Sequence, residues 1–154
     1  MSGEVRTCLW FHDAAEQAAR WYVSLLPNSF IEGVFDGESG KPAAAIEFTL
    51  SGAPFTALNG APSHAFTPAT SISVTTINQQ QTDQLWEALT TAGGQAGECG
   101  WLVDRYGLSW QVVPAVLHTL LASKDKAAAA RAHAAMLGMS KIDIGRLQSA
   151  FDNN

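Results

Sequence analysis

The order of hydrophobic segments along this chain restarts halfway, and this repeat limits the possible folds more than any other feature. The first half contains a short aromatic strand, a helix and three further strands before residue 60. From residue 71 the β-branched run SISVTTI opens the same order again, and it is followed by a helical stripe and the hairpin CGWLVDRYGLSWQVVP. A fixed order of elements in two halves predicts two similar sheets that pack together.

The first half also carries the signals that begin and end its helix. Asp13 followed by Glu16 is a carboxylate variant of the capping box, and it predicts Asp13 as the N-cap; Pro27 and Asn28 end the helix. A Gly-rich turn is expected at 36–42. The predicted strands of this half are 6–11, 29–35, 44–50 and 54–58.

The repeat predicts an α+β fold of two β-α-β-β-β modules, at about 5–60 and 70–114, which together form one domain over 1–114. Residues 115–154 differ, because VLHTLLA, KDKAAAARAHAAMLGM and KIDIGRLQSAF are helical by composition and spacing. Their apolar faces need burial, either on the home domain or against a partner subunit. We expect this C-terminal extension to cover the home domain.

Composition excludes several classes of protein. With 47% hydrophobic and 15% charged residues, the 154-residue chain is too apolar to be disordered. A net charge of −5 without any Lys/Arg run argues against a nucleic-acid partner. The start MSGEVRTCLWFHD has no secretion signal pattern, and no segment of about 18 apolar residues follows. We therefore expect a cytoplasmic protein with no membrane partner, whose two cysteines are thiols.

Several segments are similar to one known group of proteins. CLWF, ARWYVSLLPNSFI, FTALNG and CGWLVDRYGLSWQVVP, set in two β-α-β-β-β halves, resemble the PhnB-like branch of the vicinal oxygen chelate superfamily. That superfamily contains glyoxalase I, bleomycin-resistance and fosfomycin-resistance proteins and extradiol dioxygenases. Members of the branch are often labelled 3-demethylubiquinone-9 3-methyltransferases. This sequence has no G-x-G loop between a strand and a helix, so it lacks the mark of an ordinary adenosylmethionine or dinucleotide fold.

The resemblance implies a cavity enclosed by the two curved sheets, where metal-dependent relatives hold a divalent ion. Their ligands commonly lie on the first strand of each half and on the last strand, and these positions correspond here to Arg6, Ser71 and Gln111. A guanidinium has no lone pair to donate, and a neutral hydroxyl and a carboxamide are weak ligands. We therefore predict no catalytic metal and no other cofactor, and the residues assign no catalytic group.

Alternation along the strands predicts which side chains line this cavity. Trp110 should pack behind the sheet, whereas Trp10 and Trp101 are either ligand platforms or core residues. Gln111 either contacts a ligand or bonds within the sheet, because a buried carboxamide requires partners. The predicted cavity residues are Arg6, Cys8, Trp10, Asn59, Ser71, Ser73, Cys99, Trp101, Ser109 and Gln111, with Phe55 and Ala57 as further candidates.

Two other sets of residues suggest chemistry. Cys8 and Cys99 form a nucleophile or redox pair if both thiols lie at one pocket near Arg6; the simpler alternative is that they are small buried hydrophobes. Glu47 is a base if it points inward, and Asp104 beside the Tyr106-Gly107 turn is expected to cap that turn.

Together these features predict a protein that binds a small organic molecule in its cavity without a catalytic metal. Such a binding or sequestering role resembles that of the bleomycin-resistance proteins. The resemblance and the Ala-rich C-terminal helices predict that it is a homodimer. Two enzyme functions stay open: a metal-dependent lyase or isomerase of the glyoxalase type, and the methyltransferase that the family label names. A dimeric interaction module is a further alternative.

Overall fold

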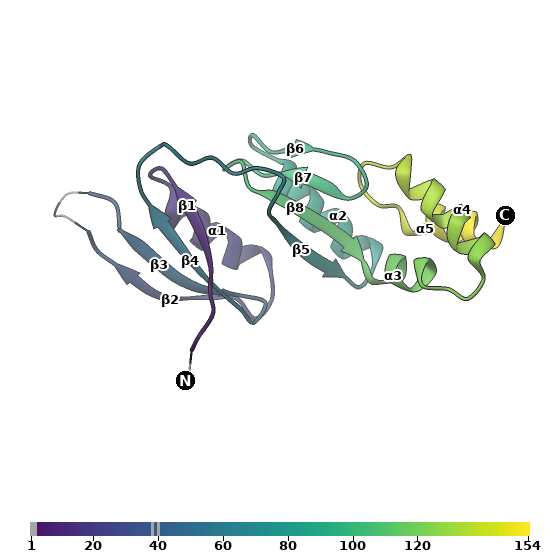
Figure 1. Cartoon of the computed structure of the whole chain (residues 1–154), viewed down its shortest axis with the longest axis horizontal. Helices are drawn as coiled ribbons and strands as arrows, with labels where there is room; N and C mark the ends of the chain where they lie inside the picture. The colour runs from purple at the N-terminus through teal and green to yellow at the C-terminus, as the bar shows by residue number, and fades with distance from the viewer. Residues whose placement is uncertain (1–2, 38, 40) are drawn as a thin grey trace. The chain divides into compact units, whose positions relative to one another are not determined.

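Each half of the chain forms a four-stranded sheet with a helix on one face (Figure 1). The computed structural model describes residues 3–37, 39 and 41–154, and these divide into two units, Met1–Phe66 and Thr67–Asn154. The expected turn at 36–42 includes residues 38 and 40, which lie outside the described residues. The predicted α+β class and the repeated order of elements are confirmed.

The first sheet has the strand order β1-β4-β3-β2, and β1 runs parallel to β4 while the other pairs are antiparallel. Helix α1 packs on one face of this sheet. Leu9, Tyr22, Ile46 and Phe48 fill the layer between helix and strands. The elements are β1 Thr7–Phe11, α1 Ala15–Leu25, β2 Phe30–Phe35, β3 Ala45–Leu50 and β4 Ala53–Asn59.

The start of α1 is capped from another strand. The prediction that Asp13 is the N-cap is wrong, because Ala14 occupies that position and makes no side-chain cap bond. Instead Oδ1 of Asn59, at the end of β4, accepts a hydrogen bond of 2.9 Å from the backbone N–H of Ala15. One of the helix's unpaired amide groups is thus satisfied by a residue 44 positions away.

The second sheet repeats the pattern with the strand order β5-β8-β7-β6, and β5 runs parallel to β8. Helix α2 covers one face, where Trp110, Leu102 and Val112 are fully or almost fully buried. Trp110 therefore packs behind the sheet, as the alternation predicts. The elements are β5 Ser71–Thr76, α2 Gln79–Thr90, β6 Gln95–Ala96, β7 Trp101–Val103 and β8 Ser109–Pro114.

A buried carboxylate fastens the hairpin between β7 and β8. Asp104 is only 2% exposed, and its Oδ1 accepts from the N–H groups of Tyr106, at 2.8 Å, and Leu108, at 3.1 Å. Its Oδ2 accepts from the indole Nε1 of Trp110 at 2.9 Å. The turn-capping role expected for Asp104 is confirmed, and the carboxylate also ties the turn to the core.

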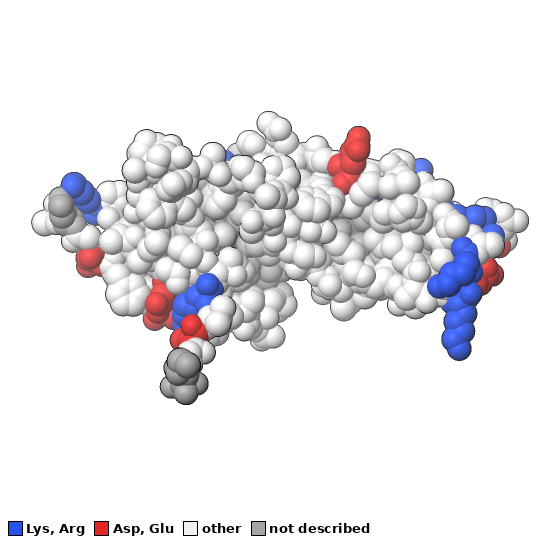
Figure 2. Space-filling view, in the orientation of Figure 1, with Lys and Arg blue, Asp and Glu red and all other residues white. Residues whose placement is uncertain are grey.

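The C-terminal extension forms three helices, α3 Ala115–Leu121, α4 Lys126–Leu137 and α5 Ile144–Asp152, which belong to the second unit. Lys and Arg side chains gather over these helices on the face drawn in Figure 2. The extension has its own small core of Leu117, Leu120, Ala132, Met139, Ile142 and Leu147.

No helix among the described residues is long and apolar enough to cross a membrane.

Candidate functional site

The face of the second sheet opposite α2 presents a row of polar and aromatic side chains. Register pairs Ser73 of β5 with Gln111 of β8, and Gln111 with Trp101 of β7. Directly paired residues lie on the same face of a sheet, so these three side chains form one cross-strand row. Ser73 is exposed, whereas Gln111 and Trp101 are half-buried.

Hydrogen bonding leaves part of this row available to a ligand. Nε2 of Gln111 donates to Oγ of Ser71 at 2.9 Å, so the sheet fixes the orientation of the carboxamide. Within the described part of the chain, no donor binds Oε1 of Gln111 and no acceptor binds the indole Nε1 of Trp101. The expected hydrogen bond of Gln111 within the sheet is therefore present and is made through its nitrogen. The carboxamide acceptor and the indole donor thus belong to directly paired residues of neighbouring strands.

Two of the other predicted residues on this unit are placed less favourably. Ser109 shares the next row with Ser71 and Val103, but it is only 2% exposed. Cys99 lies outside β7, in the turn before it, with a left-handed φ of 55°. The prediction that Cys99 continues the alternation of Trp101 is therefore wrong, because the positive φ breaks the extended backbone that alternation requires.

The first sheet has its own row on the face opposite α1. Cys8 of β1 pairs with Thr56 of β4, which in turn pairs with Glu47 of β3. Glu47 thus lies on the same face of the first sheet as Cys8 and Thr56. Desolvation raises the pKa of the Cys8 thiol, so this thiol is not an activated thiolate at neutral pH.

Arg6 begins this face but is held by protein groups. Its Nη2 lies 2.5 Å from Oε2 of Glu32 and 2.8 Å from Oε1 of Glu4, and its Nη1 donates to the carbonyl of Phe55 at 3.3 Å. Hydrogen bonds from Arg6 and then from Thr49 lower the pKa of Glu32. The guanidinium is therefore largely occupied by a local ion-pair network.

Sequence reasoning missed Glu32 and Thr49 as members of this network. The pairing of β2 with β3 shifts register between Ile31 and Gly33, and Glu32 lies at that irregularity. A bulge changes which face a side chain occupies, and simple alternation does not reveal it. The isolated Gly33 inside the strand FIEGVF is the one signal that indicated a bulge.

Trp10 packs against residues 60–64, the linker that follows β4. Its Nε1 donates to the carbonyl of Ala61 at 3.1 Å, and the ring of His64 meets it edge-on with centroids 5.1 Å apart. Gly60 sits against the indole so closely that a Cβ there would lie 2.1 Å from a ring carbon. Trp10 is 36% exposed, but its position is set by the linker.

The candidates from β4 do not lie on this face. Because β1 pairs with β4 in parallel, Phe55 lies beside Thr7 and Ala57 beside Leu9, and both Phe55 and Ala57 are buried on the α1 side. Asn59 follows the same alternation. Its side chain bonds the amide of Ala15 and, through Nδ2, the carbonyl of Ala43 at 2.8 Å. The prediction that these residues line a cavity is wrong.

The residues at the three positions where metal-dependent relatives commonly carry their ligands are poor metal ligands by their chemistry. Arg6 has no lone pair and is engaged with carboxylates, and the hydroxyl of Ser71 already accepts from Gln111. The remaining lone pair of the neutral Ser71 hydroxyl and Oε1 of Gln111 are both weak ligands. Across residues 3–37, 39 and 41–154, no three His, Cys, Asp or Glu side chains form a group that could hold a metal ion.

Comparison with solved structures identifies the fold. The PhnB protein of Bacillus cereus, which carries the name 3-demethylubiquinone-9 3-methyltransferase, is 28% identical with a TM-score of 0.68, covering 73% of this chain and all of that one. A Pseudomonas aeruginosa protein is 20% identical with a TM-score of 0.60, over 73% and 98% of the two chains. A fosfomycin resistance protein of Listeria monocytogenes is 14% identical with a TM-score of 0.52, over 77% and 97%.

The sequence comparison agrees with this assignment. No protein of curated function matches the chain significantly. A family model described as 3-demethylubiquinone-9 3-methyltransferase matches residues 3–113, which include both sheets and stop just before the C-terminal extension. The chain therefore belongs to the 3-demethylubiquinone-9 3-methyltransferase family, which is also the name that the PhnB protein of Bacillus cereus carries.

Proposed function

We propose that this protein binds a small, flat, partly polar organic molecule on the face of the second sheet opposite α2, without a catalytic metal. The observation that carries the proposal is the row of Ser73, Gln111 and Trp101. Trp101 offers an aromatic platform, Oε1 of Gln111 accepts a hydrogen bond, and the Trp101 indole donates one. Binding sites for small molecules combine apolar rings with a few such oriented polar groups.

The chemistry of the row favours a neutral ligand that both donates and accepts hydrogen bonds. The carboxamide is fixed by its bond to Ser71, so a ligand meets an acceptor that is already oriented. Neither Gln111 nor Trp101 carries a formal charge, so a fully charged ligand group would gain no ion pair there. A planar primary amide matches the arrangement, since one group supplies both the donor and the acceptor.

The test uses benzamide as the neutral probe, with benzoate and benzylamine as its charged counterparts. We expect benzamide to bind with a dissociation constant of about 1 mM, in the range usual for so small a molecule, and to bind more tightly than either charged probe. Gln111→Leu removes the acceptor while keeping the bulk, so affinity should fall about tenfold. Gln80→Leu is the matched control, because Gln80 is exposed on α2.

Metal content is measured on the same preparations, before and after incubation with nickel, zinc, manganese and iron(II). The proposal predicts that benzamide affinity is the same with and without chelator. One tightly held metal per chain, lost in Gln111→Ala, would contradict the metal-free site and support the glyoxalase-type enzyme instead.

Assembly as a homodimer is part of the proposal, because the resemblance implies it. Sedimentation equilibrium is the appropriate measurement. A mass equal to that of one chain at every concentration would contradict this part, without bearing on the binding face.

A further inference from the structure

The C-terminal extension meets the second sheet at the turn that precedes β7. The N–H of Cys99 donates to the carbonyl of Met139 at 2.7 Å, and the N–H of Gly100 donates to the carbonyl of Ser140 at 2.8 Å. Oγ of Ser140 donates in turn to the carbonyl of Gly97. The segment 139–144, called the strap below, is thus hydrogen-bonded to the turn 97–100 through both backbone and side-chain groups.

This turn has a backbone that needs support. Cys99 and Gly100 both have positive φ, 55° and 83°, and the left-handed region is unfavourable for a residue such as cysteine. A Cβ at Gly100 would lie 2.8 Å from the carbonyl oxygen of Val112 and 3.1 Å from Cγ1 of Ile142, so the strap approaches closely. Trp101, the platform of the proposed site, is the next residue. The path of the turn therefore sets the direction in which Trp101 leaves it.

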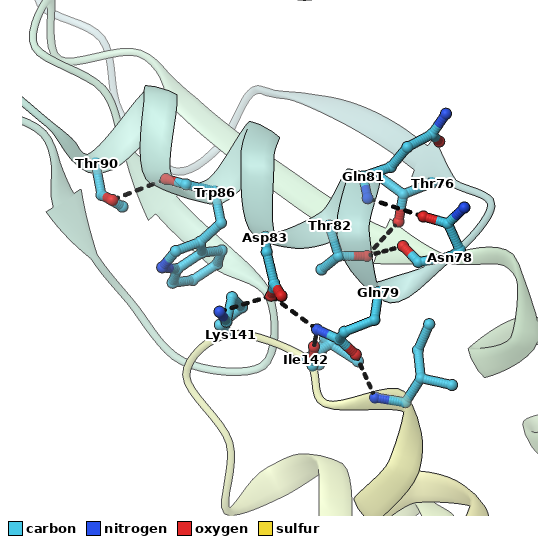
Figure 3. Close-up of polar contacts among 11 residues, drawn as sticks. Thr76, Asn78, Gln79, Gln81, Thr82, Asp83, Trp86, Thr90, Lys141 and Ile142 are labelled. Atoms are coloured by element: carbon cyan, nitrogen blue, oxygen red, sulfur yellow. Dashed lines mark hydrogen bonds and ion pairs between the residues drawn. The ribbon is translucent and has the colours of Figure 1, made fainter.

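One glutamine on α2 holds the strap through both ends of its carboxamide (Figure 3). Nε2 of Gln79 donates to the carbonyl of Ile142 at 3.1 Å, and its Oε1 accepts from the N–H of Ile144 at 2.8 Å. Nε2 also donates to Oδ1 of Asp83 at 2.9 Å, which fixes the rotamer of the amide.

An ion pair reinforces this attachment at its outer side. Nζ of Lys141 lies 2.6 Å from Oδ1 of Asp83. Hydrogen bonds from Lys141 and then Gln79 lower the pKa of Asp83, so the carboxylate stays ionised at neutral pH. Both side chains of the pair are about two fifths exposed, and the pair is accordingly the weaker part of the attachment.

We propose that the strap, held by Gln79, fixes the turn 97–100 and thereby positions Trp101 and the Gln111 row beside it. Gln79 is a positioning residue, since it acts through the strap and touches no part of the binding face. The strap lies outside residues 3–113, the part of the chain that the family model matches. The inference rests on the proposed function for its purpose, but its structural content is tested without any ligand.

Amide hydrogen exchange in the full-length protein measures the coupling directly. In Gln79→Ala, the strap loses two hydrogen bonds. We expect the amides of Cys99 and Gly100 to exchange roughly ten- to thirtyfold faster, because they open together with the strap. The matched control is Gln80→Ala, one residue along the same helix turn, and it should leave both amides unchanged. The amides of β1 to β4 serve as an internal reference.

Thiol labelling supplies a second readout on the same variants. The chain has two cysteines, and Cys8 belongs to the first unit while Cys99 belongs to the turn. Alkylation of Cys99 by iodoacetamide should quicken in Gln79→Ala relative to alkylation of Cys8. Because Cys8 is already exposed, its rate is the reference for reagent reactivity, and an unchanged ratio of the two alkylation rates would contradict a local device.

A second pair of variants approaches the attachment from the strap. Ile144 is the first residue of α5, where proline is tolerated, and Asp143 before it has the extended backbone that a following proline requires. Ile144→Pro removes the N–H that Gln79 accepts, whereas Ile144→Ala keeps it. The proposal predicts faster exchange at Cys99 and Gly100 in Ile144→Pro than in Ile144→Ala. Equal exchange in the two variants, or a released strap with an unchanged turn, would overturn it.

The measurements distinguish failure of the proposed function from failure of the strap proposal. If wild-type protein binds no benzamide while Gln79→Ala still speeds exchange in the turn, the proposed role of the strap stands and the proposed ligand class is wrong. If benzamide binds and Gln79→Ala changes neither exchange nor affinity, the binding face stands and the strap has no positioning role.

Discussion

Replacing Asp104 by alanine should lower the free energy of unfolding by about 3 to 5 kcal/mol. The carboxylate accepts two backbone N–H groups and the indole N–H of Trp110, and alanine leaves all three without this acceptor. Each buried donor that loses its partner costs about 1 to 3 kcal/mol. The turn at Gly107 is exposed, and water entering there offsets part of the sum. The estimated cost therefore lies in the lower part of the range obtained by adding three such losses.

Urea unfolding followed by circular dichroism measures this effect as a lower midpoint with an unchanged slope. Asp36→Ala, which removes an exposed carboxylate, is the control and should change stability by less than about 0.5 kcal/mol. In a Trp110→Phe background the indole donor is already gone, so Asp104→Ala should cost about 1 kcal/mol less. A cost below about 1 kcal/mol, or an identical cost in both backgrounds, would refute the account of the hairpin.

Three further results are expected from the first unit. Asn59→Ala should destabilise the protein by about 1 to 2 kcal/mol in urea unfolding, whereas Asp13→Ala should have almost no effect; the reverse order would restore Asp13 as the cap. Gly60→Ala should cost about 1 to 3 kcal/mol and shift the fluorescence of Trp10, because the new Cβ overlaps the ring; unchanged fluorescence would contradict this contact. The pKa of Glu32 is lower in the folded state, so its ion pair stabilises the protein above the ordinary carboxyl pKa of about 4.3 and loses this effect as the pH falls through the lowered value. Glu32→Gln should therefore lose less stability in acid than wild type does. An equal loss in the two proteins would count against the network.

Local pattern was sufficient for most of the fold. The apolar spacing of α1, the alternation of β5 and the turn residues of the β7–β8 hairpin each specify one structure. The repeat of element order then gave the architecture. For the site, the same alternation placed Ser73, Gln111 and Trp101 correctly on one face, because these strands are regular at those positions.

Interactions between distant residues could not be predicted in this way. Asn59 caps a helix 44 residues earlier, and Gln79 binds Ile142, 63 residues later, and nothing local marks either partner. Cys99 has a positive φ and donates its N–H to the carbonyl of Met139, 40 residues later, so the strand begins only after the position at which alternation placed it. Each error arises where tertiary contacts fix the backbone or the rotamer.

Chemical-shift mapping with benzamide tests the central claim most directly, because it reports where a ligand lies. Backbone, side-chain amide and indole N–H signals of the full-length protein are followed during a titration with chelator present. The account predicts that the indole N–H of Trp101 and the side-chain amide of Gln111 shift together and saturate at about 1 mM, while the indole of Trp21 stays in place. No saturable shift at Trp101 and Gln111, or a shift that appears only after metal is added, would contradict it.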